Sequence, residues 1–170
     1  MAVVATVWAG SDRAYAPLAR ALTALPPGSK LAVGYPPGAV NVSSQHPPTV
    51  HLAGLAVIGA DAFVPTLFAY PGQQPLSLRP RYAALAAAAS PDDFWAVLVE
   101  GRPDDGRVAR ALAQYDFILL AGGGPFQPQP GAPLALRAAG AGARLYAVAP
   151  RQLNGAARSG SPAGRRDDRG

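Results

Sequence analysis

The segment Asp116-Phe-Ile-Leu-Leu-Ala121, followed at once by Gly122-Gly-Gly124, decides the fold class of this chain. A continuous apolar run of this length, ended by glycines, is typical of a strand that is covered on both faces. Two other short apolar runs, residues 30–35 and 144–149, have the same character. Residues 63–70 also look extended, although the proline within them confines that segment to a sheet edge or to the start of a strand.

Between these runs the sequence indicates helices. An apolar stripe predicts a helix at about residues 12–25, which either begins at an Asp12 cap, with Pro17 near its first turn, or continues an earlier helix. Residues 91–100 follow a strong helix start at Ser90, but their apolar run is compatible with a strand as well. Further helices are expected at residues 50–58, 81–89, 104–114 and 133–139. The sequence therefore predicts an α/β domain, a small layered sheet of about four short, mostly parallel strands flanked by helices.

The composition excludes several classes of site. Nineteen glycines and nineteen prolines bring the chain near the level of low-complexity sequences, but 49% apolar residues argue for a folded core. The absence of cysteine excludes a disulfide framework, a thiolate metal site and a cysteine nucleophile. Two histidines argue against a zinc site made of protein ligands alone, so neither a metal nor another cofactor is predicted.

The positive charge is concentrated at one end of the chain. The net charge is +5, and residues 151–170 contribute +3 of it through five arginines and two aspartates. The remaining cations are scattered and do not alternate with aromatic residues, so no nucleic-acid partner is expected. We predict an apolar N-terminal stub at residues 1–11, a single α/β domain at residues 12–150 and a disordered basic tail at residues 151–170.

Seven residues are candidates for ligand binding, and each has a simpler structural interpretation. The triplet Gly122, Gly123 and Gly124 follows a strand, where a phosphate cradle would lie. The prolines that come next remove amide donors and delay the following helix, so a plain turn is favoured. Asp116, at a strand end, could bind a ligand or act as a base. Acceptance of hydrogen bonds from backbone amides is the favoured alternative.

The other candidates lie in loops. His51, five residues after His46, could titrate as a pH switch or bind a ligand, but a half-buried structural role is favoured. Gln73 and Gln74 could recognise sugar hydroxyls, and capping of a turn is their simpler role. The sequence shows no set of nucleophile, base and oxyanion donors, so no catalytic residue is predicted.

One stretch, Ala62-Phe-Val-Pro-Thr-Leu-Phe-Ala-Tyr-Pro-Gly-Gln-Gln-Pro-Leu76, resembles a segment of the soluble C-terminal domains of bacterial polytopic membrane proteins. These are the C-type, polyprenyl-phosphate-sugar-dependent glycosyltransferases, a group that includes the protein O-mannosyltransferase-like enzymes. The flanking segments Leu25-Pro-Pro-Gly-Ser-Lys-Leu31, Tyr115-Asp-Phe-Ile-Leu-Leu120 and Leu145-Tyr-Ala-Val148 agree in order. The resemblance covers about residues 20–149.

The resemblance implies a domain on the extracytoplasmic face of the bacterial inner membrane, after the last membrane span. The implied partners are a membrane-embedded segment of the same or a neighbouring protein and a lipid-linked sugar. No catalytic residue carries over, because the catalytic acid of that family lies in a loop between early membrane helices.

A second hypothesis comes from the residues themselves. It is a free-standing, cytoplasmic, Rossmann-like enzyme or nucleotide-binding protein that uses the strand ends at Gly34, Asp116 and Gly122–Gly124.

Overall fold

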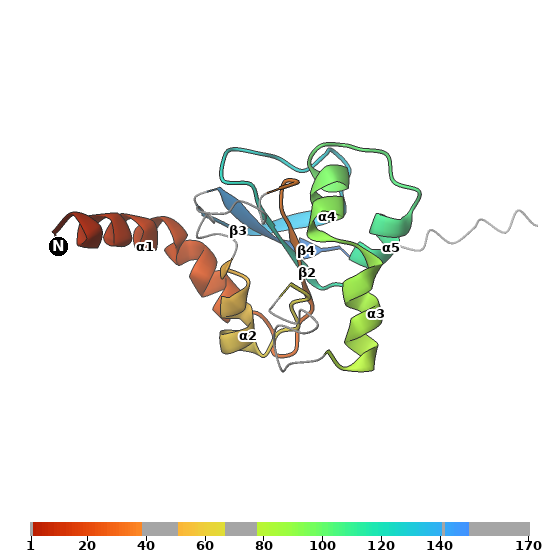
Figure 1. The fold of residues 1–170 in the computed structure, drawn as a ribbon, viewed down its shortest axis with the longest axis horizontal. Helices are drawn as coiled ribbons and strands as arrows, with labels where there is room; N and C mark the ends of the chain where they lie inside the picture. Colours follow the sequence, from red (N-terminus) through yellow and green to blue (C-terminus); the bar gives the residue numbers. More distant parts are fainter. Residues whose placement is uncertain (1, 39–50, 67–77, 141, 150–170) are drawn as a thin grey trace, which may run out of the picture.

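The computed structural model describes residues 2–38, 51–66, 78–140 and 142–149, and for residues 2–12 it describes the backbone alone. A four-stranded sheet lies between two layers of helices (Figure 1). Its strands are β1 (Leu31–Gly34), β2 (Phe117–Ala121), β3 (Leu134–Gly140) and β4 (Ala143–Val148). The helices are α1 (Ala2–Thr23), α2 (Gly54–Ala60), α3 (Pro80–Ala88), α4 (Pro91–Leu98) and α5 (Arg107–Leu112).

The sheet is mixed, which corrects the prediction of mostly parallel strands. The strand order is β1-β2-β4-β3. β1 and β2 are parallel, whereas β4 is antiparallel to both β2 and β3. Only two residues separate β3 from β4, and so short a connection joins antiparallel strands. Gly142 of this turn has a φ of +69°, a left-handed conformation that glycine adopts without strain.

The expected helix at residues 133–139 is wrong, because this segment forms β3. Its alanine content favours a helix locally, but pairing with β4 overrides that weak preference. The predicted extended segment at residues 63–70 contributes an isolated parallel bridge between Phe63 and Lys30, and residues 67–70 lie outside the described part. The α/β class is confirmed, with a sheet built from a different set of strands.

The first helix begins earlier than the predicted start at Asp12. α1 runs without a break from Ala2, so the alternative of a continuing helix is the one observed. Pro17 lies inside it on an exposed position. Leu18 and Leu22 are fully buried beside it, and their packing against the sheet offsets the hydrogen bond that the proline removes.

Three expected helices, α3, α4 and α5, pack on the face of the sheet opposite α1. α3 corresponds to the alanine-rich segment, and α4 settles residues 91–98 as a helix. Ser90 caps α4 through a reciprocal capping box with Asp93. The Asp104 carboxylate accepts hydrogen bonds from the Val108 and Ala109 amides at the start of α5.

α2 begins at Gly54, later than the predicted start at residue 50.

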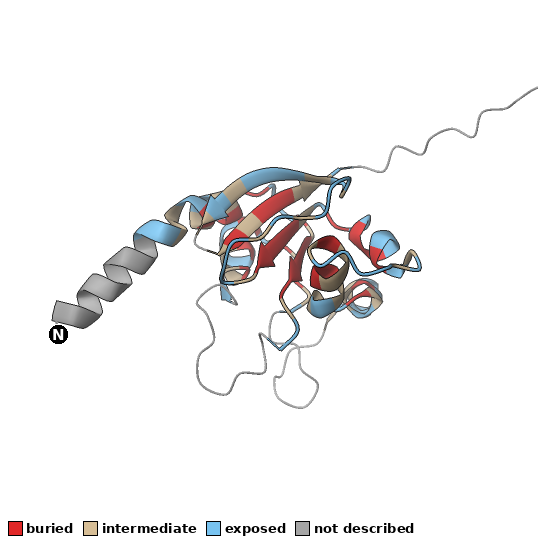
Figure 2. Ribbon diagram, turned by 90° about the horizontal axis from the view of Figure 1, so that it is seen from above, coloured by how far each residue is buried: buried red, intermediate tan, exposed pale blue. Residues whose placement is uncertain are grey.

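Alternation along the strands divides the core into two clusters. Leu31, Val33, Leu119 and Leu145 face α1 and the segment around α2. Ala32, Ile118, Leu120 and Tyr146 face α3, α4 and α5. Figure 2 shows the buried residues on these central strands and on the inner sides of the helices, so β1 and β2 are covered on both faces, as the apolar run of β2 predicted. The edge strand β3 is largely exposed. The predicted tail, residues 151–170, lies outside the described part of the chain.

Candidate functional site

The carboxyl ends of β1 and β2 are the first place to look for a site, because open α/β sheets bind ligands there. Gly34 ends β1 and Gly122 follows β2 at the same edge of the sheet. A Cβ atom on Gly34 would lie 2.6 Å from Leu120 Cδ2 and 3.4 Å from Phe94 Cβ. Gly34 therefore serves the close packing of α4 on the sheet.

The glycine triplet forms a turn whose first two amides are already used. The amides of Gly122 and Gly123 both donate to the Gly142 carbonyl, at 2.9 and 3.1 Å. A Cβ atom on Gly122 would overlap the Trp95 ring, while one on Gly124 would meet no atom within 4 Å. These contacts are those of a packed turn, and they occupy two of the donors that a phosphate cradle requires.

Beside this turn lies a ladder of two aromatic rings and one guanidinium group. The rings of Trp95 and Phe126 meet edge-on with centroids 4.9 Å apart. The Arg144 guanidinium of β4 lies 5.1 Å from the Phe126 centroid. The edge-on ring contact and the cation–π contact hold the segment after Gly124 against α4 and β4.

The carboxylate of Asp93 lies at the amino-terminal end of α4. Asp93 Oδ2 accepts hydrogen bonds from the Ser90 amide and hydroxyl, each at 2.9 Å. Arg107 binds the same carboxylate in bidentate fashion, at 2.9 and 3.0 Å, and also donates to the Ala88 carbonyl. The hydrogen bond from Arg107 is the main cause that holds the pKa of Asp93 well below its usual range. The negative group that a helix amino terminus favours is thus supplied by the chain itself.

Asp116 lies at the other end of β2, roughly 20 Å from Gly122 at ~3.3 Å per strand residue. Its Oδ2 accepts a hydrogen bond from the Lys30 amide at 2.8 Å, and its carbonyl accepts one from Val148. This is the structural role that its position at a strand start favoured. The structure therefore does not bring Asp116 and the glycine triplet together.

The remaining predicted residues also lie apart from this edge. His51 is exposed in the turn that precedes α2, which corrects the favoured expectation of a half-buried structural role. Gln73 and Gln74 lie outside the described residues. Within the described ranges, no group of three or more His, Asp or Glu side chains is arranged to hold a metal ion.

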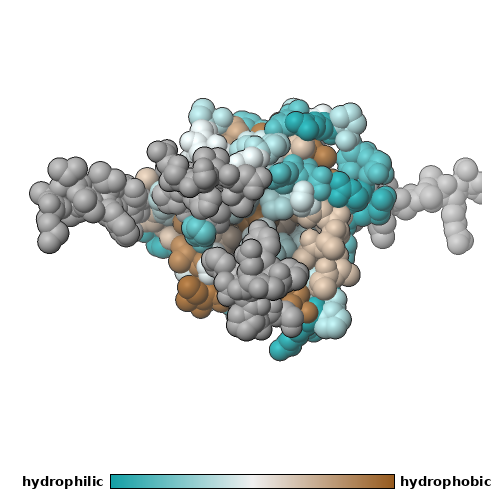
Figure 3. Space-filling model, in the orientation of Figure 1, coloured by the Kyte–Doolittle hydropathy of each residue, from teal (hydrophilic) through white to brown (hydrophobic). Residues whose placement is uncertain are grey.

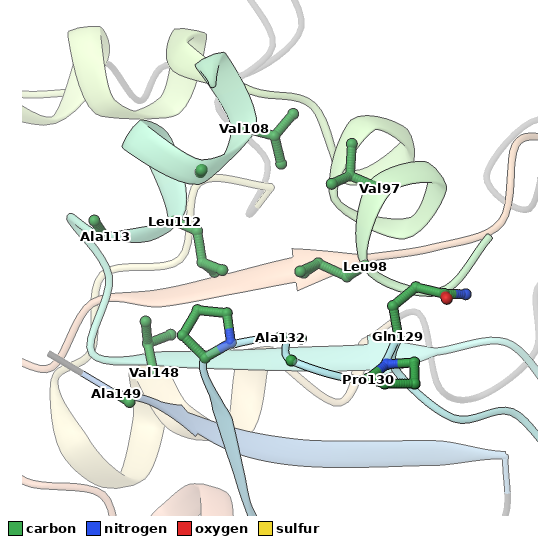
Figure 4. A pocket seen from close by; sticks show the side chains of 13 residues that line it. Val97, Leu98, Val108, Leu112, Ala113, Gln129, Pro130, Ala132, Val148 and Ala149 are labelled. Carbon is green, nitrogen blue, oxygen red and sulfur yellow. The ribbon is translucent and has the colours of Figure 1, made fainter. Parts of the chain in front are cut away.

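An apolar groove with a volume of about 440 Å³ lies between α4 and α5. Leu98 and Leu112 extend toward one another across it (Figure 4). Its other walls are the segment 129–133 and the end of β4 at Val148 and Ala149. The Gln129 side-chain amide donates to the Val99 carbonyl at 2.6 Å, so the polar group of the lining is engaged in ending α4.

Sequence reasoning missed this groove and the ladder of Trp95, Phe126 and Arg144. Both join segments that are far apart along the chain, and for residues 125–132 the sequence predicts only a proline-rich loop. A scan against protein-family models finds no match for the chain, and searches of the curated proteins and of the solved structures find none either.

Proposed function

We propose that this chain is a non-catalytic accessory domain that α1 attaches to a membrane-embedded segment of the same or a neighbouring protein. In this proposal it is similar to the extracytoplasmic tail of a polyprenyl-phosphate-sugar-dependent membrane glycosyltransferase, where it would position an acceptor or a lipid-linked donor. The observation that carries the proposal is the course of α1. Its amino-terminal half extends away from the sheet and from the other helices (Figure 1).

The sequence of that half has the character of a helix buried on every side. Residues 2–10 read Ala-Val-Val-Ala-Thr-Val-Trp-Ala-Gly and contain no charged residue. Charge begins only with Asp12 and Arg13, where α1 approaches the domain. A helix without a polar face is normally buried in protein or in lipid. Because the backbone of these turns extends away from the sheet and the other helices, their apolar sequence supports a partner outside the domain (Figure 1).

The length of the apolar part limits how it can be accommodated. Nine helical residues rise about 13 Å, less than half of the ~30 Å hydrocarbon core of a bilayer. Among the described residues, no helix combines the length and the apolarity needed to cross a membrane. The proposal therefore places residues 2–10 at the edge of a membrane-embedded partner, within the outer part of the lipid.

The environment of Trp8 tests the membrane contact. Because Trp95 is the other tryptophan, the experiment uses the full chain with Trp95→Phe, so that Trp8 alone reports. With phosphatidylcholine and phosphatidylglycerol vesicles we expect a blue shift of Trp8 emission and quenching by brominated acyl chains. A Val4→Asp, Val7→Asp variant should lose both effects and keep its melting temperature. Unchanged Trp8 emission with every vesicle would contradict the proposal.

The genomic context tests the link to a glycosyltransferase. We expect the reading frame upstream of this chain, or a neighbouring gene, to encode successive apolar helices of about 20 residues. A neighbourhood with no such helices would remove the glycosyltransferase part of the proposal and leave the membrane contact to the vesicle experiment.

A further inference from the structure

The turn between β3 and β4 lies beside the point where α1 leaves the domain. A Cβ atom on Gly140, the last residue of β3, would lie 3.0 Å from the Ala14 carbonyl oxygen and 3.4 Å from Leu18 Cβ. The apolar stretch of α1 ends at Gly10, four residues before Ala14. This end of the sheet therefore adjoins the projecting half of α1, whereas α3 lies on the far side of the domain (Figure 1).

The glycine triplet and an arginine lie at the same end of the sheet. A Cβ atom on Gly142 would lie 2.7 Å from Gly123 Cα, so the triplet packs on the β3–β4 turn. Gly123 and Gly124 are both exposed. Arg144 follows Gly142 by two residues, and its guanidinium lies over the Phe126 ring. The exit of α1, an open turn and a restrained cation are thus neighbours in space.

Arg144 gives this end of the domain a positive charge. In the part of the chain that the structure describes, no carboxylate forms an ion pair with Arg144. The sequence from residue 117 to residue 166 contains no aspartate or glutamate. Asp12 and Arg13, which follow the apolar stretch of α1, have opposite charges that cancel. Stacking on the Phe126 ring restrains the guanidinium without neutralising it, so its charge favours an anionic partner.

We propose that this end of the domain rests on the surface of an anionic lipid bilayer and that Arg144 contacts the head-group phosphates. The inference rests on the proposed function, because insertion of residues 2–10 would bring the β3–β4 turn to the lipid surface. A basic side chain near an anionic membrane surface strengthens binding about fivefold. This attraction falls off within the Debye length, about 10 Å at 0.1 M salt. Anionic lipid would therefore select the orientation in which Arg144 faces the bilayer.

Vesicle binding of the full chain tests the role of the charge. Arg144→Gln should weaken binding to mixed phosphatidylcholine and phosphatidylglycerol vesicles about fivefold and leave binding to pure phosphatidylcholine unchanged. Arg81→Gln is the matched control, because the Arg81 guanidinium also lies over a ring, 4.7 Å from the Tyr82 centroid, but on α3. It should leave both affinities unchanged.

The outcomes of this experiment separate the two proposals. Equal losses in the two variants, or full binding by Arg144→Gln, would overturn the inference and leave the membrane contact of α1 standing. No binding to any vesicle would overturn both proposals.

Spin labels test the orientation independently of charge. The chain contains no cysteine, so a single introduced cysteine is labelled alone. Gly124→Cys places the label in the open turn, where a Cβ atom meets nothing within 4 Å, and Ala83→Cys places it on an exposed position of α3. On vesicles that contain a nickel-chelating lipid, we expect faster relaxation of the label at position 124 than of the label at position 83. Equal relaxation of the two labels would overturn the inference, while the Trp8 experiment decides the contact of α1 separately.

Discussion

The Arg107 guanidinium binds both carboxylate oxygens of Asp93, at 2.9 and 3.0 Å, and so joins the start of α5 to the start of α4. The same carboxylate completes the capping box of α4 with Ser90. Arg107 also donates to the Ala88 carbonyl at the end of α3, at 3.2 Å. Three helices that pack on one face of the sheet are therefore tied together at a single ion pair.

Replacement of Asp93 by alanine should lower the free energy of unfolding by about 1–2 kcal/mol, because it removes both the helix cap and the bidentate pair. The Glu100–Arg102 pair, 2.9 Å apart on the surface, provides the control. Glu100→Gln should change the stability by less than about 0.5 kcal/mol. Urea denaturation of the two variants measures the difference. Equal losses would show that Asp93 acts as an ordinary surface residue.

The Asp93 contact should also make stability depend on pH in the acid range. Its pKa in the folded chain is held well below the value of about 3.9 for an unfolded aspartate, chiefly by the hydrogen bond from Arg107. Its contribution is therefore present above about pH 4 and is lost as the pH falls through the folded pKa. The urea midpoints of the unmodified chain and Asp93→Asn should differ at pH 7 and converge in strong acid. A gap that stays constant with pH would contradict this assignment.

A buried tyrosine should have the opposite effect in alkali. Burial raises the pKa of Tyr115 to about 12, and its hydroxyl donates to the Leu85 carbonyl at 3.3 Å. The neutral phenol is favoured in the folded chain, so its contribution is complete below pH 10 and is lost as the pH rises toward 12. Tyr115→Phe should cost about 1 kcal/mol at pH 7 and reduce the loss of stability between pH 10 and 12. Alkaline unfolding followed by circular dichroism tests this, and an unchanged alkaline slope in the variant would contradict it.

Close packing at the glycine triplet predicts a difference between neighbouring glycines. Gly122→Ala should destabilise the fold by about 1–3 kcal/mol, because the added methyl group overlaps the Trp95 ring. Gly124→Ala is the matched control, since no atom lies within 4 Å of the new methyl group. It should change the stability by less than about 0.5 kcal/mol. Thermal unfolding distinguishes the two, and a tolerated Gly122→Ala would mean that the ring can move aside.

The contacts of the same triplet predict that nucleotides do not bind there. The amides of Gly122 and Gly123 are held by the Gly142 carbonyl, and the start of α4 is occupied by Asp93. A ligand at 100 times its dissociation constant would add about 2.7 kcal/mol of stability. We expect no rise in melting temperature with a panel of nucleotides and nucleotide-sugars. A clear rise with any of them would favour the alternative of a Rossmann-like nucleotide-binding protein.

Features that depend on neighbouring residues along the chain could be predicted from the sequence. The apolar run of Phe117–Ala121 predicted a strand covered on both faces, because each face of a buried strand needs apolar side chains. The Ser90 start indicated a helix beginning there, because the cap, the proline and the carboxylates act within one turn, while the apolar run that follows left a strand open. The structural role of Asp116 was the favoured interpretation for the same reason, since a strand start leaves amides that need an acceptor.

Which distant segments meet could be seen only in the folded chain. The alanine-rich residues of β3 have a local preference for helix, and the strand forms because β4 returns beside it to satisfy its backbone. The role of the glycine triplet depends on Trp95 and Gly142, which no spacing within the triplet can reveal. The groove likewise exists because α4, α5 and the end of β4 converge. Local sequence patterns indicate the conformational preference of a segment. The partner of that segment across the core is selected by packing between residues that are far apart along the chain.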